Sequence, residues 1–236
     1  MTSPVLGNYD LGFQTWPTEK RYNCGRSAQK FYGGKMKFDP YEYIGVIVPG
    51  SVVLFAASLL YKDFIPALNS TLSLGDFGLV LILAFVAGHI VQAGGNLWES
   101  VIWHFFGGMP TSWVGNEKNA LLTEKQTQRL SQRLESDFEA TCEEIKNGRG
   151  PTREIVARIQ KDGGSERIEK FNRNYGLMRG IAVAFGASAV LAVIKNPEDW
   201  KVAALLFGIA AVATYRMARF GIHYAREVYV VYLTLR

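Results

Sequence analysis

FGLVLILAFVAGHIVQAGGNL, residues 77–97, is a segment of 21 residues that has no formal charge and follows Gly75 and Asp76. A helix rises about 1.5 Å per residue, so this segment is long enough to cross the roughly 30 Å hydrocarbon core of a bilayer. The 236-residue chain is 48% hydrophobic and only 20% charged, which is too apolar for an ordinary soluble domain. We therefore predict a multi-pass membrane protein.

A second uncharged segment, residues 43–61, is 19 residues long and lies between Glu42 and Lys62. It is predicted to span the membrane as an uncleaved helix, because the N-terminus lacks the pattern of a cleaved signal peptide. Pro49 and Gly50 occupy its middle. Proline has no N–H to donate, so a carbonyl near Gly45 is expected to be left free.

Two further spans are predicted as a hairpin. Residues 177–194 contain a single charge, Arg179, and residues 202–215 form an apolar run that ends before Arg216. Only residues 195–201 separate them, and Asn196 and Pro197 there are typical of the start of a returning helix. Small residues in both runs predict close helix packing or self-association: they are Gly180, Ala184, Gly186, Ala189, Ala192, Gly208, Ala211 and Ala213.

The distribution of basic residues predicts the orientation. Six Lys or Arg precede the first span and twelve lie between Lys118 and Arg173, whereas residues 62–76 contain one and residues 195–201 contain two. Positive charge stays on the cytoplasmic side. Both termini and the central segment are therefore expected in the cytoplasm, with the protein in the inner (plasma) membrane. Cys24 and Cys142 would then face the reducing side, where a structural disulfide is not expected.

The predicted fold class is an all-α polytopic membrane protein, with four transmembrane helices and a small helical cytoplasmic domain between spans 2 and 3. We divide the chain into an N-terminal arm (1–42), spans 1 and 2 with their loop (43–115), the helical cytoplasmic domain (116–176), and spans 3 and 4 with a basic C-terminal extension (177–236). That extension ends in a Val- and Tyr-rich tail, helical or strand-like, whose apolar side needs a neighbour.

The cytoplasmic domain is predicted to contain three helices. The first begins at a capping box, Thr123 with Gln126, and its apolar residues recur every three or four positions up to Gly148. The second opens at Pro151, and the third starts at Ser165 and continues into span 3. These helices are expected to bury their apolar faces against one another, against the arm or against another copy of the chain.

Polar residues on the second span recur every three or four positions: they are His89, Gln92, Asn96, Glu99 and Trp103. At about 100° per residue they lie on one face of the helix. Polar groups are costly in hydrocarbon unless partnered, so this intramembrane stripe should face the bundle interior, another subunit or water. It is interpreted as a hydrogen-bonded seam between helices, as the wall of an aqueous path or proton relay, or as a catalytic or ligand site.

Geometry argues against a metal site on this helix. His89 and Glu99 are ten residues apart, about 15 Å along the axis, whereas metal bonds to such ligands are about 2 Å long. The chain has no HExxH, CxxC, GxSxG or phosphate-loop motif. We therefore assign no catalytic residue, metal ligand or cofactor, and an enzyme would need groups from several helices.

A second stripe, of basic residues, leaves the membrane at the inner end of span 4: Arg216, Arg219, His223 and Arg226. Such residues commonly extend toward anionic lipid headgroups. They could also bind another anion, such as a nucleotide-type messenger, an acidic partner or a nucleic acid backbone, although no nucleic-acid motif supports the last.

Glu99 and Arg179 are predicted to form an ion pair, because span 2 ends and span 3 begins at about the same depth. An unpaired charge near hydrocarbon is costly, so pairing is the favourable arrangement for both. Arg216, Arg219 and Glu42 reach a similar depth, and a small ring of charges is the alternative.

These features predict an oligomeric, channel-like or membrane-perturbing protein, in contact with lipids and controlled through its cytoplasmic domain by a signal or a soluble partner. In the number of its spans and in its cytoplasmic domain, the predicted architecture resembles the small multi-pass effectors of prokaryotic antiviral defence systems, which damage or depolarise the cell membrane once activated. Two alternatives stay open: a non-conducting anchor or scaffold for a soluble partner, and an intramembrane enzyme that uses the face from His89 to Glu99.

Overall fold

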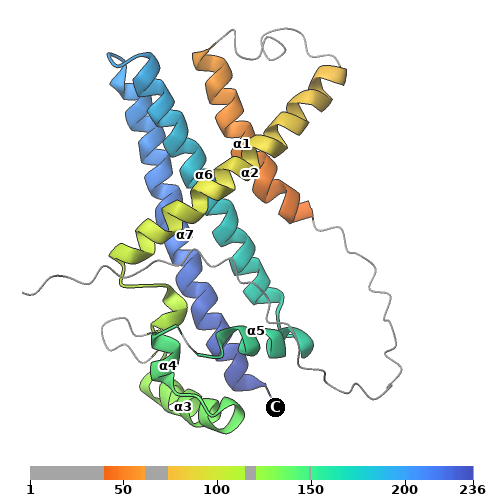
Figure 1. Cartoon of the computed structure of the whole chain (residues 1–236), viewed down its shortest axis with the longest axis vertical. Helices are drawn as coiled ribbons and strands as arrows, with labels where there is room; N and C mark the ends of the chain where they lie inside the picture. The colour runs from red at the N-terminus through yellow and green to blue at the C-terminus, as the bar shows by residue number, and fades with distance from the viewer. Residues whose placement is uncertain (1–39, 62–73, 115–120, 149, 236) are drawn as a thin grey trace, which may run out of the picture. The chain divides into compact units, whose positions relative to one another are not determined.

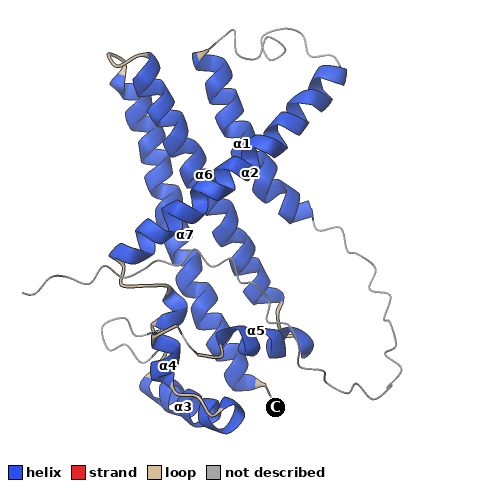
Figure 2. Cartoon of the chain, in the orientation of Figure 1, coloured by secondary structure: helices blue, strands red, loops and turns tan. Residues whose placement is uncertain are grey.

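The structure, a computed structural model, describes residues 40–61, 74–114, 121–148 and 150–235. In these ranges every regular element is a helix (Figures 1 and 2): α1 (Pro40–Leu60), α2 (Leu74–Phe105), the short 3-10 helix η2 (Pro110–Ser112), α3 (Glu124–Phe138), α4 (Cys142–Lys146), α5 (Thr152–Lys161), α6 (Glu166–Lys195) and α7 (Trp200–Thr234). The all-α prediction is confirmed. Residues 1–39 of the predicted arm, with Cys24, lie outside the described residues.

Four helices, α1, α2, α6 and α7, are long and apolar enough to cross a membrane, which confirms the four predicted spans. The last two extend well beyond the apolar runs that identified them: α6 has 30 residues and α7 has 35. The Val- and Tyr-rich tail is thus the end of α7 and not a strand. The orientation of the termini stays a prediction.

Glycines allow α1 and α2 to cross with their backbones in contact (Figure 1). A Cβ atom on Gly50 would lie 1.9 Å from the carbonyl oxygen of Ala84, and one on Gly88 would lie 2.1 Å from that of Val46. Any larger side chain at either position would force the helices apart. The crossing therefore uses the small-residue packing that is common between membrane helices.

The helices α6 and α7 run side by side as a hairpin (Figure 1), and several of their small residues are buried. Ala184, Ala189 and Ala213 are buried, as expected from their size. Gly208 and Ala211, which the sequence placed with them, are exposed instead. The buried positions Ala203, Ala210 and Met217 recur every seven residues, so Gly208 and Ala211 fall on another side of α7.

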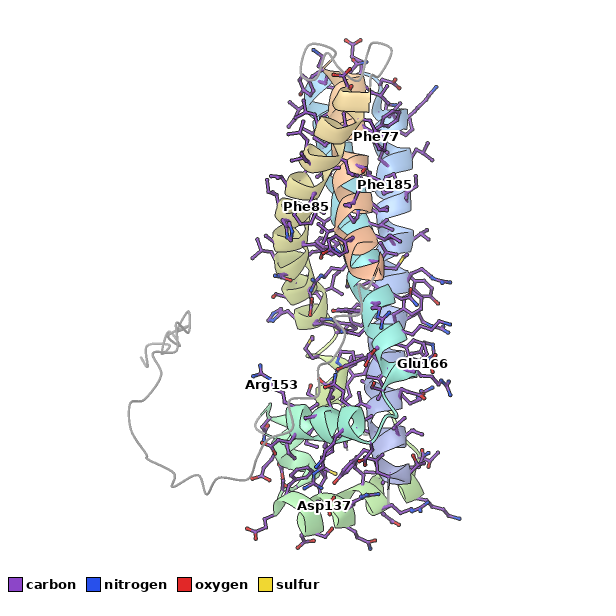
Figure 3. All side chains as sticks on the ribbon, turned by 90° about the vertical axis from the view of Figure 1, so that its right-hand side faces the viewer. Phe77, Phe85, Asp137, Arg153, Glu166 and Phe185 are labelled. Atoms are coloured by element: carbon purple, nitrogen blue, oxygen red, sulfur yellow. The ribbon has the colours of Figure 1, made fainter. Side chains whose placement is uncertain are left out.

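The helices α3, α4 and α5, residues 121–161, form a helical cap on the last turns of α7. The core of this cap contains residues from all four helices: Leu130, Leu134, Ile145, Ile155, Ile159, Ala225, Val228, Tyr229 and Tyr232. The neighbour that the apolar tail needed is therefore the cap, and the cap helices bury their apolar faces against α7. In Figure 3 the labelled Asp137 lies in the cap, at the opposite end of the described part of the chain from Phe77 of α2.

The long amphipathic helix predicted from Thr123 to Gly148 is wrong, because it divides into α3 and α4. Glu139 adopts a left-handed conformation (φ 51°) that ends α3. Thr141 then caps α4 with a second capping box, in which Glu144 accepts from the Thr141 N–H at 2.7 Å. Thr141 and Glu144 have the three-residue spacing of a capping box. This start signal for α4 was overlooked in the sequence because the apolar periodicity continues across the break between α3 and α4.

Candidate functional site: a buried polar cluster

Five side chains from α2 and α6 are joined by polar contacts in the half of the bundle that is nearer the cap: Gln92, Glu99, Trp103, Tyr175 and Arg179. We call them the polar cluster. The helix α2 presents the first three along one side, at spacings of seven and four residues, because these steps return to nearly the same side of a helix. Tyr175 and Arg179 are four residues apart on α6 for the same reason.

Gln92 connects three helices through its amide. Its Nε2 donates to the carbonyl oxygen of Gly45 at 2.8 Å, and its Oε1 accepts from Nη2 of Arg179 at 3.2 Å. Gly45 is four residues before Pro49, so its carbonyl is the one that proline leaves without an intrahelical donor. A side chain of α2 thus satisfies a backbone group of α1, which would otherwise be unpaired at membrane depth.

Arg179 and Glu99 form an ion pair between Nη1 and Oε2, and their side chains are only 19% and 17% exposed. The structure thus brings these two predicted partners together. Burial weakens solvent screening and makes the loss of either partner costly. The Nε of Arg179 is buried without a hydrogen-bond partner among the described residues, so within them the guanidinium is bonded through Nη1 and Nη2 only.

Two glycines leave room for the polar cluster. A Cβ atom on Gly95 would lie 3.1 Å from Nε of Arg179. On α6, a Cβ atom on Gly180 would lie 2.8 Å from Cγ of Pro49 and 2.9 Å from Nε2 of Gln92. Sequence reasoning placed Gly180 among the packing residues but did not assign Gly95. The sequence signal for Gly95 was the pair Gly94 and Gly95, which precede Glu99 by five and four residues.

Below the ion pair, Nε1 of Trp103 donates to the hydroxyl of Tyr175 at 2.8 Å. Both rings lie against α7 at Gly221, where a Cβ atom would be 2.9 Å from Cζ2 of Trp103. The Glu99–Arg179 pair and these two rings line a hollow of about 410 Å³, which Pro110 and Tyr224 also line. A hollow of this size with a few convergent polar groups can hold a small polar molecule or several waters.

The intramembrane stripe is not a single face with one environment, which corrects the sequence interpretation. Gln92 and Glu99 are turned inward, whereas His89 and Asn96 are exposed. The stripe covers about 80° of the helix circumference at about 100° per residue, and α1 and α6 cover only one edge of it. Neither exposed side chain has a hydrogen-bond partner within residues 40–61, 74–114, 121–148 and 150–235, although His89 packs edge-on against Phe85 at 4.6 Å.

The division bears on the enzyme alternative. His89 points away from the bundle that contains Glu99, so the two do not face one site within the chain. In the described ranges no cluster of three or more His, Cys, Asp or Glu side chains has the geometry to bind a metal ion.

The basic stripe on α7 is also divided. Arg216 and Arg219 are exposed, and they line a hollow of about 270 Å³ together with Tyr215, Phe220 and His223. We call this the basic hollow. Arg226 does not line it, because its Nε donates to the carbonyl oxygen of Leu121 at 3.1 Å. Arg226 therefore ties α7 to the cap, a structural contact that the sequence did not predict.

Sequence reasoning missed a second polar centre, Asp137 in the cap. Its carboxylate accepts from the hydroxyl of Tyr232 at 2.9 Å and pairs with Arg158 at 2.8 Å and Arg133 at 3.6 Å. Burial raises the pKa of this carboxyl, but the tyrosine hydrogen bond and the two arginines bring the pKa below its ordinary value. Asp137 thus joins α3, α5 and α7. Only its i, i+4 relation to Arg133 was legible in the sequence.

Comparison of the chain with protein-family models, with curated proteins and with solved structures finds no match.

Proposed function

We propose that the chain is an oligomeric membrane effector with a channel-like or membrane-perturbing activity, and that the helical cap controls this activity through α6 and α7. The observation that carries the proposal is the continuity of α7. The same helix supplies the core of the cap at Tyr229 and Tyr232 and lies against the polar cluster at Gly221. A helix transmits rotation or translation along its length, so a displaced cap moves the wall of the cluster.

The ion pair is suited to act as a latch in this mechanism. In the closed arrangement Arg179 is bound by Glu99 and Gln92, and Gln92 in turn holds the free carbonyl of α1. A shift of α6 would break these contacts together and leave buried polar groups without partners. Because such groups are costly in hydrocarbon, water entry or rearrangement of the helices would follow.

The exposed half of the intramembrane stripe supports assembly into several copies. His89 lies midway along α2, and Asn96 follows two turns later, both exposed. Exposed polar groups at this depth favour a neighbouring helix or water over lipid. The partner is a second copy of the chain, because confinement to the membrane raises the concentration of copies near one another. A conducting path lined by His89 and Asn96 would then lie between copies and not inside one chain.

Ion flux from liposomes tests the proposal. Purified protein should release trapped ions, and Asn96→Leu and His89→Leu should each reduce the flux. Ile90→Leu is the matched control, because Ile90 is 70% exposed on the same helix and carries no polar group. Glu99→Gln should raise the flux by releasing the latch. Absence of flux from every assembled variant would refute a channel-like activity.

The second candidate function is a non-conducting anchor, and one observation favours it. Within one chain the inward polar groups are almost fully paired, and the cap presents charged helices with a core of its own. An anchor predicts that a soluble protein co-purifies through the cap and that no flux occurs.

The antiviral role implied by the architectural resemblance belongs to the first proposal, and it predicts depolarisation of infected cells.

A further inference from the structure

An apolar groove runs between α2 and the α6–α7 hairpin. Its volume is about 770 Å³, and small residues such as Ala182, Gly186 and Ala211 line it together with the large side chains of Leu97 and Phe106. The groove forms because α2 slants across the hairpin (Figure 1), and the small residues of the hairpin leave the space between the helices unfilled. All three helices are candidate membrane spans, so hydrocarbon surrounds the opening.

The basic hollow adjoins this groove at Tyr215, which lines both. Arg216 and Arg219 follow Tyr215 by one and four residues, toward the cap. Neither arginine has a carboxylate partner within the described ranges, and no acidic side chain lines the groove or the hollow. Both contact aromatic side chains: Cζ of Arg216 lies 5.1 Å from the centre of the Phe220 ring, and Nη1 of Arg219 donates to the Tyr215 hydroxyl at 3.3 Å.

A continuous surface of this kind, apolar within the span and cationic at its end, is complementary to one class of molecule. A hydrocarbon chain suits a groove whose polar groups are almost restricted to Thr214 and Trp98, which already bond each other at 3.2 Å. Guanidinium groups match the oxygens of a phosphate in both charge and geometry. Tyrosine and tryptophan are favoured at the level of lipid headgroups, where the two parts meet.

We propose that the groove and the basic hollow together bind one anionic phospholipid, with an acyl chain between α2 and the hairpin and the phosphate between Arg216 and Arg219. This site is separate from the polar cluster and does not depend on conduction. The proposal names the chemical class of ligand for the basic stripe, an anionic phospholipid. Arg226 lies outside the site because its side chain donates to the carbonyl oxygen of Leu121 in the cap.

Lipid titration of the full chain in non-ionic detergent, followed by native mass spectrometry, tests the site. The probes are dioleoyl phosphatidylglycerol, dioleoyl phosphatidylcholine and glycerol phosphate, which carries an anionic headgroup without chains. The double variant Arg216→Gln with Arg219→Gln should bind phosphatidylglycerol about 30-fold more weakly, since each basic residue near an anionic surface contributes a factor of about five. Its affinity for phosphatidylcholine should change little.

The groove needs its own variant. Ala211→Phe should lower the affinity for both lipids by about tenfold, as expected if roughly two methylene groups of the acyl chain can no longer be buried in the groove. Val212→Phe is the matched control, because Val212 is adjacent in sequence, 64% exposed and outside the groove. For the charge variants the control is Arg153→Gln with Lys161→Gln, which removes the same charge from the exposed surface of α5.

Three results would overturn the proposal. The first is equal phosphatidylglycerol affinity in the Arg216 and Arg219 variant and in the α5 control. The second is equal lipid affinity in Ala211→Phe and Val212→Phe. The third is displacement of phosphatidylglycerol by glycerol phosphate at equal concentration, which would make the hollow a site for soluble anions. Lipid binding is read without flux, so failure here is distinguishable from failure of the proposed effector activity.

Discussion

Neutralising the ion pair between Glu99 and Arg179 should destabilise the bundle in a strongly non-additive way. Removal of one partner from a buried pair costs about 3 to 5 kcal/mol, because the other charge remains buried. These side chains are 19% and 17% exposed, so we expect the lower end, about 3 kcal/mol, for Glu99→Gln and for Arg179→Gln. Independent effects would give about 6 kcal/mol together.

The double variant should lose far less than that sum. With both charges absent, two neutral amides face each other and can form hydrogen bonds, so no buried charge remains unpaired. We expect a total loss of about 3 to 4 kcal/mol, and hence a coupling energy of about 2 to 3 kcal/mol. The assay is reversible unfolding in mixed micelles, followed by tryptophan fluorescence, because Trp103 lies in the same cluster.

An exposed pair on α6 provides the control. Arg173 and Glu169 are 3.0 Å apart, and their side chains are 40% and 41% exposed. The same cycle of glutamine substitutions there should give a coupling of about 0.3 to 0.5 kcal/mol, typical of surface i, i+4 pairs. Additive effects of the Glu99 and Arg179 substitutions, within about 0.5 kcal/mol, would contradict the buried contact, since two side chains that contact each other inside the bundle cannot act independently.

Three further predictions concern the helix crossing, the cap and the orientation. Gly50→Ala should destabilise the bundle by about 1 to 3 kcal/mol through overlap with a carbonyl of α2. Gly45→Ala should not, because nothing lies within 4 Å of its Cβ position, and thermal unfolding in detergent compares the two variants. Because the folded pKa of Asp137 is lowered, its carboxylate contributes stability above the ordinary value of 3.8 and loses it as the pH falls through the folded pKa; acid titration of cap unfolding should show this loss in the wild type and not in Asp137→Asn. A membrane-impermeant thiol reagent applied to intact cells should label Glu198→Cys and leave Cys142 unlabelled, and labelling of Cys142 would reverse the predicted orientation.

The membrane spans could be predicted from the sequence because transfer into hydrocarbon depends on local composition and length. Residues 77–97 have no charge over 21 positions, and no tertiary contact is needed to make them apolar. The missing hydrogen-bond donor for the carbonyl of Gly45 could also be predicted from the sequence. The covalent structure of Pro49 removes its donor wherever the helix lies.

Other features could not be read from the sequence, because they depend on which helices become neighbours. The period of the α-helix places His89, Gln92, Asn96 and Glu99 on one face, but α1 and α6 cover only part of it. The environment of each side chain was therefore settled by packing. The partner of the Gly45 carbonyl likewise required α2 to cross α1 at Gly50 and Gly88.

Hydropathy and helical period are properties of short segments, so the sequence alone predicts four helices that are long and apolar enough to cross a membrane. Packing decides that the end of α7 forms the centre of the cap, and that Arg226 bonds the carbonyl of Leu121 in the cap whereas Arg216 and Arg219 line the basic hollow. All three arginines share one stripe on α7. Their environments differ because the cap packs only around the last turns of this helix, and long-range contacts of this kind leave no periodic signal in the local sequence.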